Sequence, residues 1–328
     1  MKRRAPPAAG ARAPARAPAL AGALAAALAG ALAAALAAGC GGATGTDARP
    51  PGTDAAPPGT DAAPPATDAG PLPPGADWAV GGDWLEANLA TVQIVDLRDQ
   101  STFEAGHVPG AVRVSISALL ATVGGIPAQV APPATVTSVL AAAGLVRDAT
   151  IVAYDGNSGM DASRFVWTAR YDDVPDARLL DGGFVAWLAA GRPVETGPVA
   201  PAPSAYVAGP EHPELFADAD WVLARLDDPA VVIVDARTPA EYAAGHVPGA
   251  LSFDWTDNFS GGALLPRADL LARFAAIPPG AQVVTYCTTG MRGAVDWLVL
   301  RWLGWTDVRL YDGSWVEWGS RPELPVEY

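Results

Sequence analysis

The sequence predicts an α/β protein with two tandem domains, each built on a mostly parallel central sheet flanked by helices. Two observations carry this prediction. The first is an internal repeat, because the hexapeptide Gly-His-Val-Pro-Gly-Ala occurs at residues 106–111 and again at 245–250. The second is that short β-branched runs alternate with helical patterns within each half, which is typical of parallel sheets covered by helices.

The repeat extends well beyond the hexapeptide. An Asp-x-Arg triplet precedes each copy, at residues 96–98 and 235–237, and the segment 180–187 is echoed by the segment 311–318. The chain has 328 residues, which is enough for two ordinary hydrophobic cores. The predicted organisation is a first domain at about 77–196, a Pro- and Gly-rich linker at 197–212 and a second domain at 213–328.

In the second half, β-branched runs predict buried strands at residues 231–234, 282–285 and 308–311. Apolar residues at helical spacing predict helices at 270–276 and 293–303. Sites in sheets of this kind lie at the carboxyl ends of the strands. The loop between the strand at 282–285 and the helix at 293–303 is therefore the expected place for chemistry.

Composition excludes several kinds of partner and site. The net charge is −14 and Lys2 is the only lysine, whereas nucleic-acid binding requires clustered Lys and Arg. The two cysteines, Cys40 and Cys287, are too few for a disulfide framework, and neither their spacing nor nearby histidines indicate a zinc site. We therefore expect no nucleic-acid partner, no metal and no cofactor.

Residues 1–39 predict a secretion signal that ends at a lipid attachment site. A basic start precedes an uncharged Ala- and Leu-rich run and small residues before Cys40. The tail Leu-Ala-Ala-Gly-Cys resembles the bacterial lipobox, whose cysteine is acylated and becomes the mature N-terminus, with Ala37 in place of the usual leucine. The alternative is an uncleaved membrane anchor of roughly 20 apolar residues.

Either alternative places the rest of the chain outside the cytoplasm, tethered to a bacterial membrane and facing the periplasm. Gly41, directly after Cys40, favours the outer membrane by its resemblance to known sorting behaviour. Residues 40–76 repeat a Pro-Pro-Gly-Thr-Asp-Ala-Ala unit and carry too few apolar residues to form a core. They are expected to form a disordered, extended spacer.

The two copies separate residues that serve the fold from residues that serve chemistry. His107 and His246 occur in both halves, so we interpret them as structural rather than as catalytic acids or bases. Arg98 and Arg237, two residues after an Asp in each half, are expected to pair or hydrogen-bond within the scaffold. The Asp-Gly pairs of the later repeat predict turns from strand to helix.

Cys287 is the residue that only one copy has. In the first half Asp155 takes its place, and Asp161 stands opposite Arg292 when the two loops are aligned on their Gly-Met pairs. The first loop is one residue longer. Because both informative positions have become carboxylates there, we expect that loop to repel anions and the first domain to be inactive.

Cys287 is the candidate nucleophile. Backbone amides of the loop, the start of the following helix and the guanidinium of Arg292 all favour negative charge there, and the thiolate is the reactive form. The alternative, an inert buried cysteine, leaves the small and polar residues that follow it without a purpose. The residues expected to bind the substrate are Thr288, Thr289, Gly290, Met291, Arg292 and Gly293.

The paired hexapeptides, the loop at 286–292 and the segment 311–318 together resemble the tandem-domain rhodanese family of thiosulfate and 3-mercaptopyruvate sulfurtransferases. The resemblance covers residues 77–328 and implies a silent first domain and a second whose cysteine cycles through a persulfide. Cys287 would attack the outer sulfur of thiosulfate, sulfite would leave, and cyanide or a thiol would then remove the sulfur. Phosphatases of this fold have a loop one residue longer, so the present loop favours sulfur over phosphate.

The choice between thiosulfate and 3-mercaptopyruvate as the donor is less constrained. Mercaptopyruvate-preferring members use a further arginine at the position of Glu241, and this absence weighs more than the lack of a basic residue within the loop. Thiosulfate is therefore expected, with Arg292 offering a positive charge to the dianion. A non-enzymatic persulfide carrier is the remaining alternative. The sequence leaves open whether Arg164 or Arg170 of the first domain reaches the pocket.

Overall fold

The computed structural model describes residues 78–156 and 158–328. The predicted signal at 1–39, Cys40 and the spacer at 40–76 lie outside the described residues. The two predicted domains both fall within one compact unit of the chain. Within the described ranges, none of the helices has the length and apolar character needed to cross a membrane.

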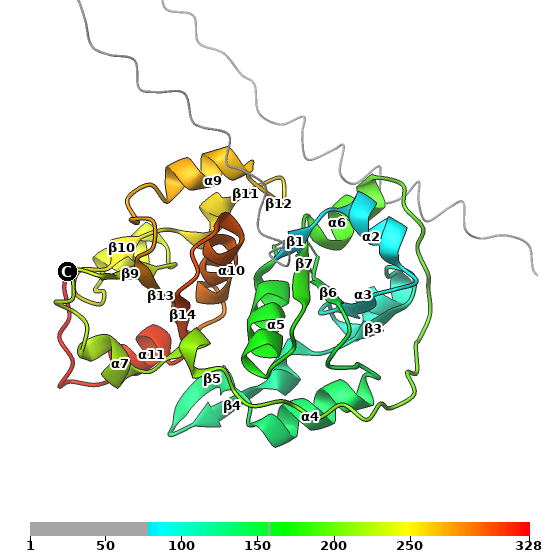
Figure 1. Cartoon of the computed structure of the whole chain (residues 1–328), viewed down its shortest axis with the longest axis horizontal. Helices are drawn as coiled ribbons and strands as arrows, with labels where there is room; N and C mark the ends of the chain where they lie inside the picture. The colour runs from blue at the N-terminus through cyan, green and yellow to red at the C-terminus, as the bar shows by residue number, and fades with distance from the viewer. Residues whose placement is uncertain (1–77, 157) are drawn as a thin grey trace, which may run out of the picture. The chain divides into compact units, whose positions relative to one another are not determined.

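The first half is an α/β domain around a five-stranded sheet (Figure 1). Its elements are β1 (Ala79–Val80), α2 (Gly82–Asn88), β2 (Gln93–Asp96), α3 (Gln100–Ala105), β3 (Ala111–Arg113), the 3-10 helix η1 (Ile116–Leu119), β4 (Leu120–Val123), β5 (Ile126–Val130), α4 (Pro133–Ala142), β6 (Ile151–Tyr154), α5 (Met160–Tyr171), β7 (Ala177–Leu180) and α6 (Gly183–Ala189). The sheet has the order β1-β7-β6-β2-β3 with every pair parallel, and β4 and β5 form a separate antiparallel hairpin.

The second half repeats this architecture. Its elements are η2 (Pro213–Leu215), β8 (Phe216–Ala217), α7 (Ala219–Leu223), β9 (Val231–Asp235), α8 (Pro239–Ala243), β10 (Leu251–Ser252), η3 (Trp255–Asn258), β11 (Phe259–Ser260), β12 (Ala263–Leu264), α9 (Arg267–Arg273), β13 (Gln282–Tyr286), α10 (Gly293–Leu303), β14 (Val308–Tyr311) and α11 (Ser314–Trp318). The parallel sheet β8-β14-β13-β9-β10 matches the first sheet strand for strand, and β11 and β12 form the second hairpin.

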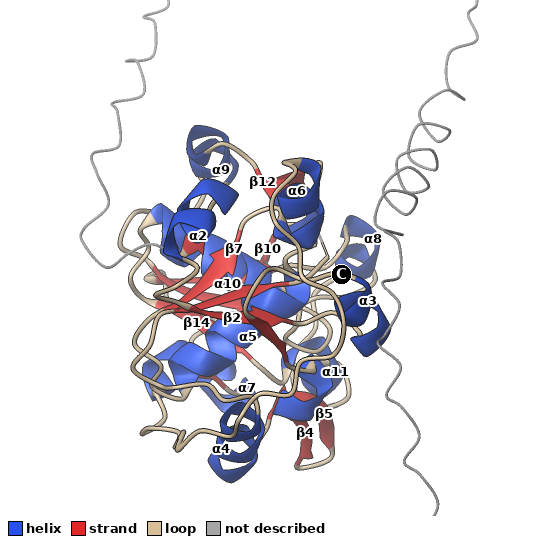
Figure 2. Cartoon of the chain, turned by 90° about the vertical axis from the view of Figure 1, so that its right-hand side faces the viewer, coloured by secondary structure: helices blue, strands red, loops and turns tan. Residues whose placement is uncertain are grey.

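Figure 2 shows helices on both sides of the strands, so the predicted fold class is confirmed. The strands predicted from β-branched runs appear as β9, β13 and β14, each within one residue of the expected bounds. Their β-branched and apolar residues are the ones that a parallel sheet covered by helices buries. The helix predicted at 293–303 is α10. The bounds predicted for α9 were wrong, since Pro266 fixes its start directly ahead of Arg267.

The central helices of the two halves, α5 and α10, pack against each other (Figure 1). Both helices follow the loop after the central strand of their own sheet, which places the two loops at comparable positions in each domain. Trp78 of the first half meets Trp297 of α10 edge to face, with ring centroids 5.3 Å apart. Trp297 also donates a hydrogen bond to the Val308 carbonyl at 2.8 Å. The halves therefore share one apolar core between them.

Asp296 is a carboxylate inside this core. It lies on α10 with no exposed surface, and its Oδ1 accepts a hydrogen bond from the Asn258 side-chain amide at 2.6 Å. Its Oδ2 has no hydrogen-bond partner within the described residues. Burial raises the pKa of Asp296 to about 7, well above the ordinary aspartate value.

Asp296→Asn is expected to flatten the dependence of stability on pH. Between about pH 4 and the folded pKa, the native state holds a proton that the unfolded chain releases, so the free energy of unfolding falls as the pH rises through this window. Asparagine has no charge to bury. At high pH the free energy of unfolding of the variant therefore exceeds that of the wild type by on the order of 2 kcal/mol. Urea unfolding of the full chain across this window measures the free energy of unfolding of both proteins. An equal dependence of that free energy on pH in both would contradict the prediction.

Candidate active site

The Cys287 loop joins the carboxyl end of β13 to the start of α10, as the sequence predicted. Its backbone is held by the first turn of α11. The Cys287 amide donates to Ser314 Oγ at 3.2 Å, the Trp315 amide donates to the Cys287 carbonyl at 3.0 Å, and the Val316 amide donates to the Thr288 carbonyl at 3.0 Å. The conformation of the loop therefore depends on where the turn before α11 is fixed.

Cys287 is a free cysteine with only 1% of its surface exposed. Such burial excludes bulky reactants from the thiol. This burial fits a small sulfur compound as substrate better than the side chain of a folded protein.

The first half shows what the same loop does without a cysteine. Asp155 stands in place of Cys287, and its carboxylate accepts hydrogen bonds from the amides of Gly159 at 2.9 Å and Asp161 at 3.2 Å. Burial raises the pKa of Asp155. This loop therefore binds its own carboxylate. In the aligned second loop the corresponding amides belong to Gly290 and Arg292, so a negative charge on Cys287 or on a sulfur attached to it meets equivalent donors.

Arg292 has a partner that the sequence did not reveal. Its Nη1 and Nη2 each donate to a different carboxylate oxygen of Glu241 at 2.8 Å, and Thr288 Oγ1 donates to the same carboxylate at 3.2 Å. The hydrogen bonds of the pair raise the pKa of Arg292 and hold the pKa of Glu241 far below its usual range. Arg292 thus keeps the positive charge that the sequence predicted for the loop, but it shares that charge with the Glu241 carboxylate.

Glu241 is held in this position by the helix that carries it. It forms a capping box with Thr238 at the start of α8, where the Thr238 amide donates to Glu241 Oε2 at 3.1 Å. A Thr followed three residues later by Glu is a sequence pattern for such a box. The pattern is adjacent in sequence, whereas the approach of Arg292 depends on how α8 packs beside the loop.

The two histidines make the same contacts in each half. Nδ1 of His107 lies 2.8 Å from the Phe103 carbonyl, and Nδ1 of His246 lies 3.0 Å from the Tyr242 carbonyl. Each imidazole also stacks on the aromatic ring of that same residue. This equivalence agrees with the interpretation of both histidines as parts of the fold.

The Asp-x-Arg triplets also form matching ion pairs. Arg98 binds Asp96 with the closest atoms 2.5 Å apart, and Arg237 binds Asp235 at 2.6 Å. In the second half the Tyr286 hydroxyl, one residue before the cysteine, donates to Asp235 at 2.5 Å. These buried pairs fix the carboxyl end of the strand from which the Cys287 loop departs.

One of the two first-domain arginines considered above reaches the second half. Arg164 on α5 reaches the second half and pairs with Asp312 at 2.5 Å, and both side chains are fully buried. Arg170 instead donates to the Ala177 carbonyl within its own half. Asp312 does lie in the predicted turn between β14 and α11, but the prediction of a simple turn missed its role between the two halves.

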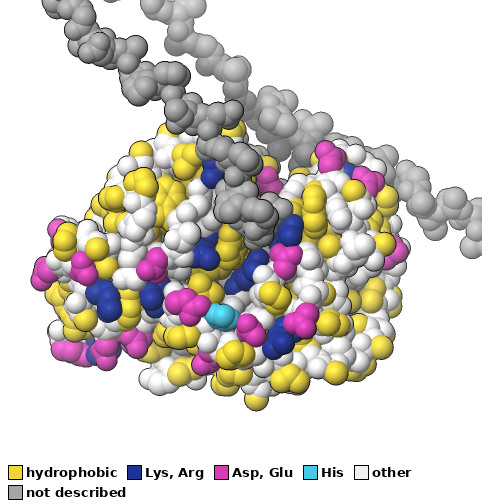
Figure 3. All heavy atoms as spheres, in the orientation of Figure 1, with side chains coloured by type: hydrophobic (Ala, Val, Ile, Leu, Met, Phe, Trp, Pro, Cys, Tyr) yellow, Lys and Arg dark blue, Asp and Glu magenta, His cyan; other side chains and the backbone are white. Residues whose placement is uncertain are grey.

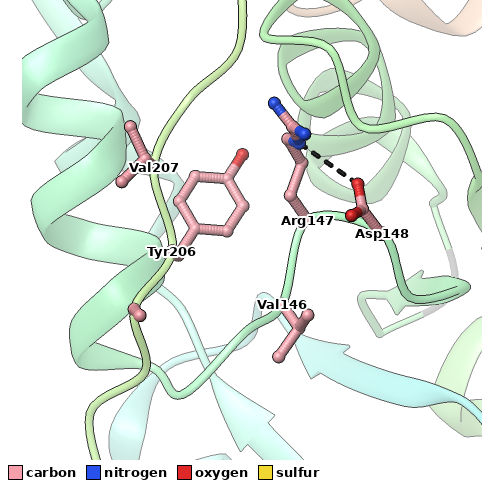
Figure 4. A pocket seen from close by; sticks show the side chains of 6 residues that line it. Val146, Arg147, Asp148, Tyr206 and Val207 are labelled. Atoms are coloured by element: carbon pink, nitrogen blue, oxygen red, sulfur yellow. Dashed lines mark hydrogen bonds and ion pairs between the residues drawn. The ribbon is translucent and has the colours of Figure 1, made fainter.

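A separate pocket lies away from this loop (Figure 4). Tyr206 of the predicted linker is buried, and Figure 4 shows its hydroxyl turned toward Arg147. That hydroxyl has no hydrogen-bond partner within the described ranges. The pocket is lined by Val146, Arg147, Asp148, Ala205, Tyr206 and Val207.

The surface of the described residues also carries charged side chains. On the face drawn in Figure 3, acidic and basic side chains lie beside one another. In the part of the chain that the structure describes, no group of three or more His, Cys, Asp or Glu side chains is arranged to hold a metal ion. The Cys287 loop therefore remains the candidate active site.

Comparison with known proteins places both halves in one family. The family model of the rhodanese-like domain matches residues 82–190 and 218–321. A thiosulfate sulfurtransferase of Azotobacter vinelandii is 34% identical over 256 residues, which are 74% of this chain and 94% of that protein. A 3-mercaptopyruvate sulfurtransferase of Escherichia coli is 30% identical over 275 residues, 76% of this chain and 98% of that protein.

A solved structure shows the same architecture. The crystal structure of an Escherichia coli 3-mercaptopyruvate sulfotransferase, described as having the rhodanese fold, aligns with a TM-score of 0.67 at 29% identity. The alignment covers 73% of this chain and 99% of that one.

Proposed function

Because this chain belongs to the rhodanese-like family, we propose that it is a sulfurtransferase in which Cys287 carries the transferred sulfur. The observation that supports this most directly is the difference between the two loops. The first loop is filled by the carboxylate of Asp155, whereas the second holds a free cysteine at the same place. Only the second loop has a side chain that can form and release a covalent bond to sulfur.

The proposed reaction has two nucleophilic steps. The Cys287 thiolate attacks the outer sulfur of thiosulfate, the sulfur–sulfur bond of the donor breaks, and sulfite leaves with the bonding electron pair. Cyanide or a thiolate then attacks the outer sulfur of the persulfide and leaves with it, which regenerates the thiolate. Charge and electrons balance in each step, so no further reactant is required.

The loop supports these steps through its backbone. The persulfide is an anion, and amides like those that bind Asp155 in the first half are placed to stabilise it. Arg292 contributes less than a free arginine does, because the Glu241 carboxylate already compensates its charge. In this proposal, the amides therefore supply most of the anion binding.

We propose thiosulfate as the donor rather than 3-mercaptopyruvate. By the resemblance stated above, mercaptopyruvate-preferring members of the family have a further arginine at the position of Glu241, which here is a carboxylate. The relatives from Azotobacter vinelandii and Pseudomonas aeruginosa, both named thiosulfate sulfurtransferase, agree with this choice. Turnover by the purified full chain with each donor, using cyanide as acceptor, tests it, and faster sulfur transfer from 3-mercaptopyruvate would reverse the assignment.

Glu241→Gln is expected to lower the KM for thiosulfate about fivefold. The change removes a negative charge beside Arg292, and the effect of such a charge at a partly exposed position is about 1 kcal/mol. The KM for mercaptopyruvate should fall less, since that donor carries one charge rather than two. Steady-state kinetics measure both values. Glu323→Gln is the control, because Glu323 pairs with Arg321 at the surface. An increase in KM would show that Glu241 serves the donor site by orienting Arg292.

The non-enzymatic alternative is a protein that accepts sulfur once and hands it only to a specific partner. The measurement that separates it from an enzyme is the number of turnovers per chain with cyanide in excess. Many sulfite molecules released per Cys287 support the enzyme. A single equivalent, with a persulfide left on Cys287, supports the carrier.

We propose further that the protein is anchored by lipid at Cys40 and faces the periplasm, with the outer membrane as the favoured location. The basic, apolar and small-residue order of residues 1–39 supports this, together with the Pro-rich spacer that follows. Labelled fatty acid should be incorporated into the wild type in a bacterial host. Cys40→Ala is expected to lose the label, and equal labelling of both proteins would contradict the proposal.

A further inference from the structure

We propose that the cysteine-free first domain is a working part of the active site, because its Arg164 positions the Cys287 loop through Asp312 and Gly290. This inference rests on the proposed function for its kinetic consequence only. The positioning itself can be measured on the cysteine without any turnover.

The comparison of the two copies singles out Arg164. With the loops aligned on their Gly-Met pairs, Arg164 on α5 corresponds to Val295 on α10. Val295 is fully buried and apolar, as expected for this face of a central helix, whereas Arg164 is equally buried and charged. The same comparison identified Cys287 as the residue that only the second copy has. Arg164 and Cys287 are thus both residues without a counterpart of the same type in the other copy, and both lie at the Cys287 loop.

The contacts of Arg164 lead into the second domain. Its Nη1 donates to Asp312 Oδ1 at 2.5 Å, and its guanidinium lies over the Trp167 ring with 4.8 Å to the centroid. The other carboxylate oxygen of Asp312 accepts a hydrogen bond from the Val130 amide at 2.7 Å. Val130 ends β5, which lies beside α11 in Figure 1. Both oxygens of Asp312 are thus bound by groups of the first domain.

Asp312 in turn fixes the segment that holds the cysteine. It lies in the turn into α11, whose Ser314 and Trp315 bind the amide and carbonyl of Cys287. A displacement of Asp312 therefore moves the groups that hold the backbone of the nucleophile.

The ion pair also touches the loop itself. Gly290 has a φ of +78°, and a methyl group there would lie 2.5 Å from Nη1 of Arg164 and 2.7 Å from Oδ1 of Asp312. The pair therefore packs directly against the loop between Cys287 and Arg292. A buried ion pair loses much of its attraction to desolvation, so stability alone is a weak reason for one here. The pair instead holds the reactive loop in a fixed position, which a flexible apolar side chain does less well.

The chain contains a matched control for this contact. Asp181, the counterpart of Asp312, accepts a hydrogen bond from the Leu264 amide at 2.7 Å. Leu264 belongs to the hairpin of the second domain, so this bond crosses between the halves in the opposite direction. It lies at the loop that holds Asp155 instead of a cysteine. Asp181→Asn therefore perturbs an equivalent contact between the halves at the loop without a nucleophile.

The test compares Arg164→Met, Arg164→Lys, the double variant Arg164→Met with Asp312→Asn, and Asp181→Asn, all in the full chain. The double variant removes both charges together, so no buried charge is left unpaired if a single variant fails to fold. Two experiments are carried out on each variant. Steady-state kinetics with thiosulfate and cyanide give kcat and KM, and peptide mass spectrometry gives the rate of alkylation at Cys287 against pH. Thermal unfolding confirms that each variant is folded.

We expect kcat to fall about 30-fold in Arg164→Met and in the double variant, because misplacing a nucleophile by about 1 Å lowers rates by up to about 100-fold. KM should change little, Arg164→Lys should recover part of kcat, and Asp181→Asn should stay within about twofold of the wild type. The pH profile of alkylation should shift in the Met and double variants only. If the wild type does not turn over thiosulfate, the proposed function fails, but the alkylation profiles still test the positioning. Folded Arg164 variants with unchanged kcat and alkylation profile, or an equal loss in Asp181→Asn, would overturn the inference.

Discussion

Cys287→Ser is expected to reduce sulfur transfer from thiosulfate to cyanide by more than about 10³-fold, because removal of a covalent nucleophile usually has an effect of this size or larger. Serine is nearly isosteric, so the buried loop should keep its shape. Its hydroxyl is a poor nucleophile toward sulfur. The rate of sulfite release by the purified full chain is the quantity to measure.

Two further proteins make this experiment decisive. Cys40→Ala is the control. Cys40 lies in the predicted lipid attachment site, so its substitution should leave turnover unchanged. Asp155→Ala tests the first loop, where removing the carboxylate should also leave turnover unchanged. Sulfite release that persists in Cys287→Ser would remove Cys287 from the reaction.

Gly290→Ala is expected to lower kcat/KM at least about 100-fold, because a shift of the reactive geometry by about 1 Å suffices for such a loss. The added methyl group would lie 2.5 Å from the buried Arg164 guanidinium, so the loop or the ion pair has to move. The positive φ of +78° adds strain for any residue other than glycine. Together these effects should reduce the free energy of unfolding by about 2–4 kcal/mol.

Gly249→Ala is the matched control for this prediction. Gly249 has nearly the same φ, +74°, but nothing lies within 4 Å of the added methyl group. The control therefore carries the backbone strain of about 1 kcal/mol without the steric conflict. Kinetics and urea unfolding of both variants separate the two effects. If Gly290→Ala behaves like Gly249→Ala in both measurements, the loop is not packed against the ion pair as described.

The two sheets were predictable because their central strands, β6 and β13, are largely buried and rich in apolar and β-branched residues. The strand at 282–285 and the helix at 293–303 were found for this reason, and with them the position of Cys287 between them. The start of α9 was missed because apolar spacing alone does not fix a helix end, whereas Pro266 does. Periodicity thus located the elements better than their ends.

The site was predictable only where its residues are adjacent in sequence or differ between the two copies. Cys287 met both conditions, and Glu241 was noticed only as the absence of an arginine. Its pairing with Arg292 joins residues 51 positions apart, and that of Arg164 with Asp312 joins residues 148 positions apart. Contacts of this kind depend on how helices and domains pack, which no local pattern specifies. The one feature of the sequence that indicated the second contact was the arginine, Arg164, at the position aligned with Val295.

The central claim is that Cys287 forms a persulfide in a loop that only the second domain has kept reactive. The most direct test is the mass of the full chain after exposure to thiosulfate with no acceptor present, followed by peptide mapping. We expect a gain of one sulfur atom on the peptide that contains Cys287, and its loss when cyanide is added. A chain that gains no sulfur, or gains it on another residue while Cys287 remains a free thiol, would show that Cys287 does not carry the transferred sulfur.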